Sequence, residues 1–424
     1  MPHVTSSLCF HNSFILFRYI NNTCHIPNPN PISSTTATKM DSDDSLIYLL
    51  PHDTLHHIFS TIPLRQIIIC RSLSKFFNHL LSSPSFLHLH STTHPPLNLL
   101  ALRLPHHRNH NHNPHPSSLH LFDPNLHLWL TFSLQFLPFH SPLPVASSLG
   151  ILYLWAESHN STESTHLNTN TNSNSNSKAL VACNPLNKQF RVLPHLGSAW
   201  SRHGSVLVDS VNASNRVMVL TELAALYFSD GVNRWLKFSS NLPSKPRSPV
   251  LVGDSAFALC DVGSPWRSQW KLFYCDLAGA ADSAPAQRWS RVERHEWGDV
   301  RPRLVRGTGN QILMVGGLKS SFSLNSPCST ILILRLDLDL MEWDEAGRMP
   351  PEFFQCFQES SKFKVFGGSD RVCFSAKRIG KLALWDPCDG KRGGEEWRWI
   401  DNLPGNGEGM YRGFVFEGRL NALP

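Results

Sequence analysis

The sequence carries little charge, and it lacks a dense cluster of one sign. Only 17% of its 424 residues are Asp, Glu, Lys or Arg, and the formal net charge is +6. Proteins that neutralise a phosphate backbone need a stripe of Lys and Arg, and none is present. Direct binding of nucleic acid is therefore not expected.

The ten cysteines include no CxxC pair and no dense framework. Scattered thiols of this kind are typical of buried, reduced side chains in the nucleus or cytoplasm. No apolar run approaches the roughly 18 residues that cross a bilayer, so no membrane segment is predicted. The short apolar run around Phe14 and Phe17 follows His11 and Asn12 and has no clean cleavage site, which argues against a secretion signal.

Tryptophan, glycine and proline are abundant, with 12, 24 and 30 residues, and they favour many short strands joined by turns. Residues 1–40 are rich in Ser, Thr, Asn and Pro and are predicted to be disordered, with Met40 as an alternative start. The histidine-rich run 105–118 and the Asn/Ser/Thr-rich run 160–178 have almost nothing to bury. Both are predicted to be expanded loops.

A small helical module is predicted for residues 45–90. Apolar side chains recur there at helical spacing, first from Leu50 to Ile62 and then from Ile67 to Leu81, and Pro63 and Pro84 end the two runs. Two or three short helices of this size need a partner or a neighbouring domain to cover their apolar faces.

The remaining chain, 97–424, contains a loose repeat. Trp235, Trp289, Trp343 and Trp397 follow one another at a constant interval of 54 residues, with Phe190 and Trp129 before them. Five β-rich runs are each expected to pair across a turn with the strand that carries the aromatic residue: ALVACNP, RVMVL, KLFYCDL, TILILRL and KLALWDP. About six such units predict a closed β-propeller, in which the last run, from Tyr411, completes a blade begun near Leu97 to Leu104. The repeated tryptophans are expected to pack between blades.

Residues 49–86 resemble the F-box, the segment through which F-box proteins bind the Skp adaptor of cullin-based ubiquitin ligases. The resemblance lies in Leu50-Pro51, Ile62-Pro63, the run from Cys70 to Phe77, and Leu80-Leu81 with Pro84 and Phe86. Two positions depart from the family, because Ser74 stands where Cys is usual and Phe77 where Trp is usual.

The later repeats resemble the kelch-type propellers of plant F-box proteins. Gly316-Gly317 and Gly367-Gly368 each lie in such a unit, and a glycine pair between strands fits a close approach or a bulge. The run CNPLNKQFRVLP resembles a strand–turn–strand motif of F-box-associated domains, with Asn187 in the place of its Thr.

The resemblance implies a substrate-recognition subunit of a Skp–cullin–F-box ubiquitin ligase, with a Skp adaptor, a cullin and an unknown target protein as partners. The residues expected to bind the adaptor are Leu50, Pro51, Leu55, Ile58, Ile62, Pro63, Leu73 and Phe77. A non-degradative scaffold or a transcriptional cofactor built on the same propeller is the alternative.

No catalytic residue, cofactor or metal site is predicted. The sequence has no P-loop, nucleophile elbow or HExxH motif. A galactose-oxidase-like propeller enzyme is the least favoured alternative, since Tyr274 and Cys275 are adjacent and a strand would point them to opposite faces. The histidines at 106, 107, 110, 112 and 115 could bind a transition metal, but no Cys or carboxylate completes the shell.

Overall fold

The computed structural model describes residues 46–104, 118–157, 178–211, 214–231, 233–278, 289–292, 302–319, 328–358, 363–387, 397–405 and 409–424. The predicted disordered segment 1–40 and the histidine cluster lie outside these residues. Of the two low-complexity runs, only Ser118 and Lys178 are described, and each begins a strand. The chain forms two compact units, one ending at Pro95 and one spanning Pro96–Pro424.

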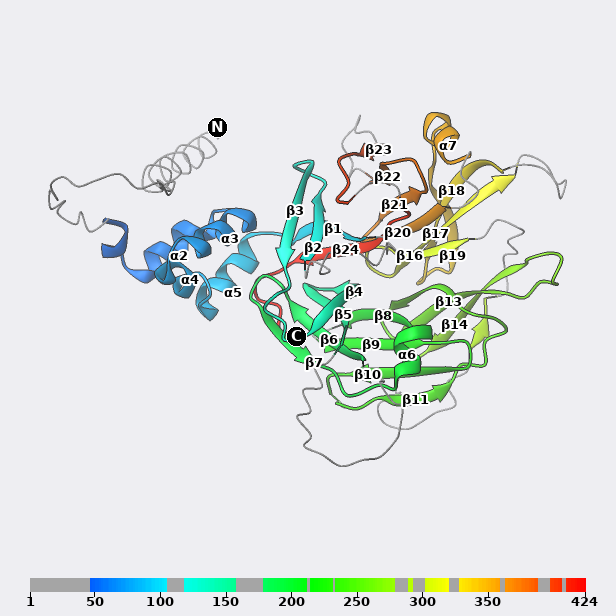
Figure 1. Ribbon diagram of the computed structural model, residues 1–424, viewed down its shortest axis with the longest axis horizontal. Coiled ribbons are helices and arrows are strands. Elements are labelled where there is room, and N and C mark those ends of the chain that lie inside the picture. Colours follow the sequence, from blue (N-terminus) through cyan, green and yellow to red (C-terminus); the bar gives the residue numbers. More distant parts are fainter. Residues whose placement is uncertain are drawn as a thin grey trace, which may run out of the picture. The chain divides into compact units, whose positions relative to one another are not determined.

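The first unit is helical (Figure 1). From residue 46 on, where its structure is described, it has a 3₁₀ turn and four α-helices: η1 (Leu46–Leu49), α2 (His52–Ser60), α3 (Leu64–Leu73), α4 (Lys75–Leu80) and α5 (Pro84–Thr93). Pro51 and Pro63 stand directly before α2 and α3, and Pro84 is the first residue of α5. A proline costs nothing there because the first N–H groups of a helix have no partner within it.

The expected two or three helices are thus four α-helices within residues 46–93. The apolar run from Ile67 to Leu81 is divided at Ser74, which has an extended backbone and accepts a hydrogen bond from the Phe77 N–H through its hydroxyl at 3.2 Å. A serine in this position caps the next helix. The departure at Ser74 therefore has a local role, because it ends α3 and starts α4.

The second unit contains six four-stranded antiparallel sheets, numbered here as blades 1 to 6. The strands of blades 1 to 3, from the centre outward, are β24 (Arg412–Gly418), β1 (Leu97–Arg103), β2 (Ser118–Asp123) and β3 (Leu128–Ser133); β4 (His140–Ser148), β5 (Ile151–Glu157), β6 (Lys178–Asn184) and β7 (Gln189–Val192); β8 (Ser205–Val211), β9 (Ser214–Leu220), β10 (Ala224–Ser229) and β11 (Leu236–Ser239). Those of blades 4 to 6 are β12 (Arg247–Val252), β13 (Ser255–Asp261), β14 (Trp270–Asp276) and β15 (Ser290–Arg291); β16 (Arg303–Arg306), β17 (Gln311–Lys319), β18 (Cys328–Asp337) and β19 (Glu342–Arg348); β20 (Phe363–Gly368), β21 (Arg371–Ala376), β22 (Leu382–Trp385) and β23 (Trp397–Ile400). Two helices lie in connections between blades, α6 (Ser198–His203) and α7 (Pro351–Gln358).

The six sheets form a closed propeller, as the repeats predict. The first strands of successive blades lie beside one another all the way round, and β20 meets β24 to close the ring. The last strand, β24, pairs with β1 from Leu97 opposite Gly418 to Arg103 opposite Arg412 (Figure 1). The two ends of this unit are therefore joined within one sheet, which leaves no open ring edge.

Six separate apolar cores hold the ring together, each formed by the facing sides of two adjacent blades. Trp235, Trp289, Trp343 and Trp397 each belong to a different core. The indole N–H of Trp235 donates to the Pro194 carbonyl at 2.8 Å, in the connection that follows the preceding blade. The expectation that the repeated tryptophans pack between blades is confirmed.

Two details of the predicted repeat were wrong: the pairing of the run RVMVL and the position of the glycine pairs. The run RVMVL is β9, which pairs with β8 and β10, whereas the strand that follows Trp235, β11, pairs with β10. The glycine pairs do not lie between strands: Gly316-Gly317 is inside β17, the second strand of blade 5, and Gly367-Gly368 ends β20, the first strand of blade 6. They are not equivalent positions of one repeat.

Candidate functional site

The helical unit has its own core, and two of the predicted adaptor-binding residues belong to it. Leu55 is fully buried and Phe77 is 8% exposed. The Phe77 ring lies 5.4 Å from that of Phe59 and 5.9 Å from that of Tyr48. These two side chains therefore shape the unit from inside rather than presenting themselves at its surface.

The other predicted residues lie at or near the surface. Leu50, Ile58 and Leu73 are 39%, 36% and 38% exposed, Pro51 and Pro63 are exposed, and Ile62 is half-buried. Pro51 and Ile58 are seven residues apart, which places them on one side of α2. Full burial of a wholly exposed apolar side chain gains about 1.5–3 kcal/mol, so burying what remains exposed of Leu50, Ile58 or Leu73 would gain roughly a third of that each. This set can therefore contribute to binding a protein.

Three further apolar residues that the sequence prediction omitted are also exposed: Tyr48 at 47%, Leu49 at 71% and Ile69 at 50%. Ile69 and Leu73 are four residues apart and share a face of α3. The signal was available, since Ile67, Ile68 and Ile69 cannot all face one core from a helix. We call Tyr48, Leu49, Leu50, Pro51, Ile58, Ile69 and Leu73 the apolar helical surface.

Imidazole groups fix α5 against the end of α2. The Nε2 atoms of His90 and His94 donate to the carbonyl oxygens of Ile62 and Ser60 at 3.2 and 2.7 Å. His56 Nε2 lies 3.1 Å from the Ser83 hydroxyl. Burial lowers the pKa of His90, which favours its neutral form. The histidines of this unit are thus part of its packing.

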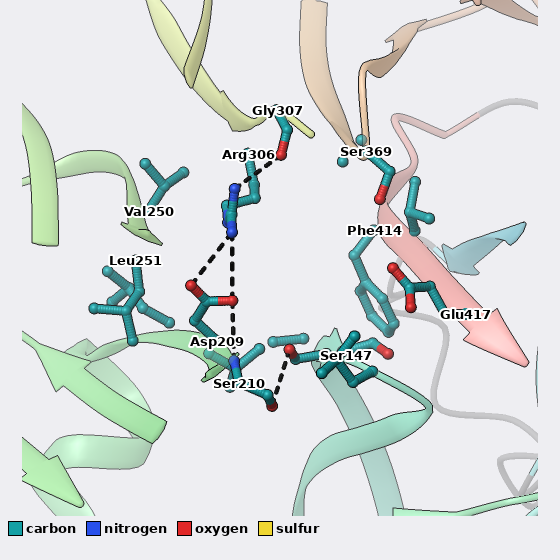
Figure 2. A pocket seen from close by; sticks show the side chains of 18 of the residues that line it. Ser147, Asp209, Ser210, Val250, Leu251, Arg306, Gly307, Ser369, Phe414 and Glu417 are labelled. Carbon is teal, nitrogen blue, oxygen red and sulfur yellow. Dashed lines mark hydrogen bonds and ion pairs between the residues drawn. The ribbon is translucent and has the colours of Figure 1, made fainter. Parts of the chain in front are cut away.

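The propeller has a pocket of about 350 Å³ at its centre, where the first strands end (Figure 2). Its lining includes Asp209, Arg306 and Glu417. Asp209 is the central group: it accepts from the Gly253 N–H at 2.6 Å and forms an ion pair with Arg306 at 3.3 Å. One carboxylate therefore connects blades 3, 4 and 5.

The other charged groups of this pocket, Arg306 and Glu417, also have partners. Arg306 donates through Nη1 to the carbonyls of Gly307 and Gly309 at 2.9 and 2.7 Å. Glu417 accepts from Arg419 at 3.0 Å. Because these charges neutralise each other, the main role of the pocket lining is to hold neighbouring blades of the ring together.

The described residues support neither a metal site nor a galactose-oxidase-like site. Within them, no group of three or more His, Cys, Asp or Glu side chains is placed to hold a metal ion. Tyr274 is 38% exposed while Cys275 is fully buried, so the two point to opposite sides of β14. Among the same residues, no helix is long and apolar enough to cross a membrane.

The helical unit matches a known family. Residues 47–89 match the F-box domain. The whole length of a protein of Arabidopsis thaliana, SKP1-interacting partner 15, is similar to 90% of this chain at 59% identity over 397 residues. An F-box/kelch-repeat protein of the same plant is 32% identical over 126 residues, which cover 29% of this chain and 27% of that protein.

Solved structures add less. TolB from Acinetobacter baumannii is similar over 75% of this chain and 66% of its own, with 12% identity and a TM-score of 0.41. That similarity is too low to bear on function. Of these similarities, only the one to the F-box/kelch-repeat protein, over 126 residues, supports the assignment of the repeats as kelch repeats.

Proposed function

The chain belongs to the plant F-box protein family, and we propose that it is the substrate-recognition subunit of a Skp–cullin–F-box ubiquitin ligase. In this function the helical unit binds a Skp adaptor, the adaptor connects to a cullin, and the propeller binds a target protein. The chain contributes proximity rather than bond chemistry. Holding the target beside the ubiquitin-conjugating enzyme raises the effective concentration of its lysines.

One observation carries the proposal. The apolar helical surface exposes seven apolar residues within residues 47–89, which match the F-box domain. Exposed apolar patches of this kind mark sites of protein association. The relative that is similar over its whole length is named for its interaction with SKP1, which supports a Skp adaptor as the protein that covers this surface.

The structure refines how the predicted residues act in this proposal. Leu50, Pro51, Ile58, Leu73 and the added Ile69 would contact the adaptor directly, because they are exposed. Ile62 and Pro63 would lie at the edge of the contact. Leu55 and Phe77 would act by holding the helices in place, because the unit's own core covers them.

The place of action belongs to the same proposal. A ubiquitin-ligase receptor works in the nucleus or cytoplasm, and the reduced, fully buried thiols of Cys183 and Cys373 fit a reducing compartment.

The test is direct binding of the purified full-length chain to a Skp adaptor, measured by calorimetry. We expect Ile69→Glu and Leu73→Glu each to weaken binding by roughly 30-fold or more, since a buried charge replaces an apolar contact. Thr92→Glu, on the exposed side of α5, is the matched control and should bind as the unchanged chain does.

Phe77→Ala separates packing from contact. Loss of a core aromatic should cost about 3–5 kcal/mol, so this variant should unfold the helical unit, whereas Ile69→Glu should leave its helical circular dichroism intact. A well-folded full-length chain that does not bind the adaptor would overturn the proposal and favour the non-degradative scaffold.

A further inference from the structure

The two ends of the propeller differ in how their charges are used. In blades 2 to 6 the first strand passes into the second at one end of the propeller, which is called the turn face. In blade 1 the same end carries the turn from the third strand to the fourth. The opposite end, which carries the connections from second to third strand and from one blade to the next, is called the loop face. Antiparallel hairpins alternate in direction, so this division holds for every blade.

At the turn face, the charged groups hold neighbouring blades together. Arg191 pairs with Asp230 at 2.9 Å, Arg216 pairs with Asp254, and Arg306 pairs with Asp209. Further round the ring, Asp370 accepts from the Thr308 N–H at 3.0 Å and Arg371 donates to the Asn98 carbonyl at 3.3 Å. This face is rich in carboxylates whose hydrogen bonds are already committed to the ring.

The loop face of blade 4 presents a tryptophan on a well-ordered loop. Trp266, between β13 and β14, is 95% exposed. The loop around it is closed by the Val262 N–H donating to the Gln269 carbonyl at 2.8 Å and the Arg267 N–H donating to the Ser264 carbonyl at 3.1 Å. A side chain at Gly263 would come within 2.0 Å of the Arg267 carbonyl, so the bend requires glycine.

The carboxylate of this loop, Asp261, accepts hydrogen bonds from the loop itself. Asp261 accepts from the Gly263 and Gln269 N–H groups at 3.0 and 2.8 Å. Burial would raise the pKa of Asp261, but these hydrogen bonds and one from Ser268 outweigh it and lower the pKa. The carboxylate therefore stabilises the loop and is not offered to a partner.

A second exposed apolar residue lies on the adjoining blade. Leu223, between β9 and β10, is 73% exposed, and its carbonyl accepts from the Ser240 N–H at 3.0 Å. The segment from Ser240 then runs to Ser244, whose hydroxyl accepts from the Asp261 N–H at 2.8 Å. These two hydrogen bonds connect the Leu223 loop and the Trp266 loop to the same segment, 240–244, of which Asn241 and Pro243 are exposed.

Positive charge surrounds this stretch. Lys245 and Arg267 are exposed, and within the described part of the chain neither forms an ion pair. Arg247 lies 4.1 Å above the Trp270 ring and adds a third cation. Against them stand the exposed Glu222 and the half-buried Asp261, whose carboxylate interacts electrostatically with Arg247. Tryptophan and arginine side by side are the residue types that dominate binding energy at protein interfaces.

We propose that the propeller binds its target at the loop face of blades 3 and 4, through Leu223, Lys245, Trp266 and Arg267, and that the bound segment carries Asp or Glu beside apolar side chains. This inference rests on the proposed function, because it identifies the surface by which the receptor holds its target. An acidic segment is attracted by the cations of this surface, whereas the ionic groups of the turn face are already paired with one another between blades.

The experiment is a selection of random twelve-residue peptides, displayed on phage, against the immobilised full-length chain. The enriched peptides should combine acidic with aliphatic or aromatic residues. Synthetic copies should bind roughly 30-fold more weakly to Trp266→Ala and to Arg267→Glu, as expected for the loss of an interface anchor. Their affinity should also fall as salt rises from about 0.05 to 0.5 M.

Leu340→Ala is the matched control, because Leu340 is 68% exposed in a turn of blade 5 at the turn face. It should leave peptide affinity unchanged. A selection without acidic peptides, or peptides whose affinity survives both loop-face variants, would overturn the inference. Adaptor binding, measured on the same variants, reports on the proposed function separately, since none of the three substituted positions lies in the helical unit.

Discussion

At the scale of single residues, the buried thiols predict how stability depends on pH. Burial raises the pKa of Cys183, Cys260 and Cys275 from an ordinary value of 9.0 to about 12. In the unfolded chain these thiols ionise near pH 9, while in the folded chain they stay neutral. The contribution of these buried thiols to the free energy of unfolding is therefore intact below a pH of about 9. It is lost as the pH rises toward the pKa that the thiols have in the folded state.

We expect each of these thiols to lower the free energy of unfolding by about 1 kcal/mol between pH 8 and pH 10. Urea unfolding across this range measures the slope. Cys183→Ala should lose stability at pH 7 through its missing sulfur contacts, yet fall less steeply above pH 9. An equal slope in both proteins would show that Cys183 does not stay neutral in the folded state.

At the scale of elements, the turn between β6 and β7 is a clamp for the C-terminus. Asn184 is fully buried, and its side-chain amide donates to the carbonyls of Arg419 and Ala422 at 2.8 and 2.9 Å. Asn187 donates to the Leu420 and Ala422 carbonyls at 3.2 and 3.1 Å. The motif in which the sequence shows Asn187 in the place of Thr therefore fixes the tail that follows β24.

Replacing Asn184 by Ala should cost about 2–3 kcal/mol, because the Arg419 carbonyl loses its donor, the Ala422 carbonyl keeps only the bond from Asn187, and the Leu186 N–H loses the Asn184 side chain as acceptor. Urea unfolding measures this loss, and Lys188→Ala, at an exposed position of the same turn, is the control that should change stability little. If Asn184→Ala unfolds like the control, the tail is not held by these bonds.

The elements also show what the sequence can and cannot predict. The interval of 54 residues between tryptophans reports a packing position, so it revealed the blades and the last strand that closes them. It gave no sign of the first strands of blades 2 to 6. The two runs joined by Thr221-Glu222-Leu223 were not separated, and RVMVL was therefore assigned to the wrong neighbour. The pairing of these two strands is determined by a three-residue turn, and the amino-acid composition of the turn does not identify it as one.

The same limit applies to the candidate surfaces. Helical spacing predicted which residues of the first unit are apolar, but not which of them α2 and α5 enclose, and so Leu55 and Phe77 were grouped with exposed neighbours. Trp266 lies outside the interval of the repeated tryptophans, and only the loop geometry shows that it is presented rather than buried.

At the scale of the whole molecule, ring closure should decide whether the propeller exists at all. A chain ending at Gly405 lacks β24, which supplies Phe416 to the core between blades 1 and 2, and it lacks Tyr411 of the core between blades 6 and 1. Both neighbours of β24, β20 and β4, would lose their contact, and β1 would become an open edge. Two of six cores fail together, so we expect loss of cooperative unfolding rather than a small decrease in stability.

A chain ending at Gly418 is the matched comparison, since it keeps β24 and removes only the clamped tail; it should still unfold cooperatively at a lower urea concentration. Urea titrations followed by tryptophan fluorescence distinguish the two truncations. In both, the helical unit is complete, so adaptor binding should persist even when the propeller is open. A cooperative transition in the chain that ends at Gly405 would mean that five complete blades and one open blade suffice, and that closure by β24 is not what holds the ring.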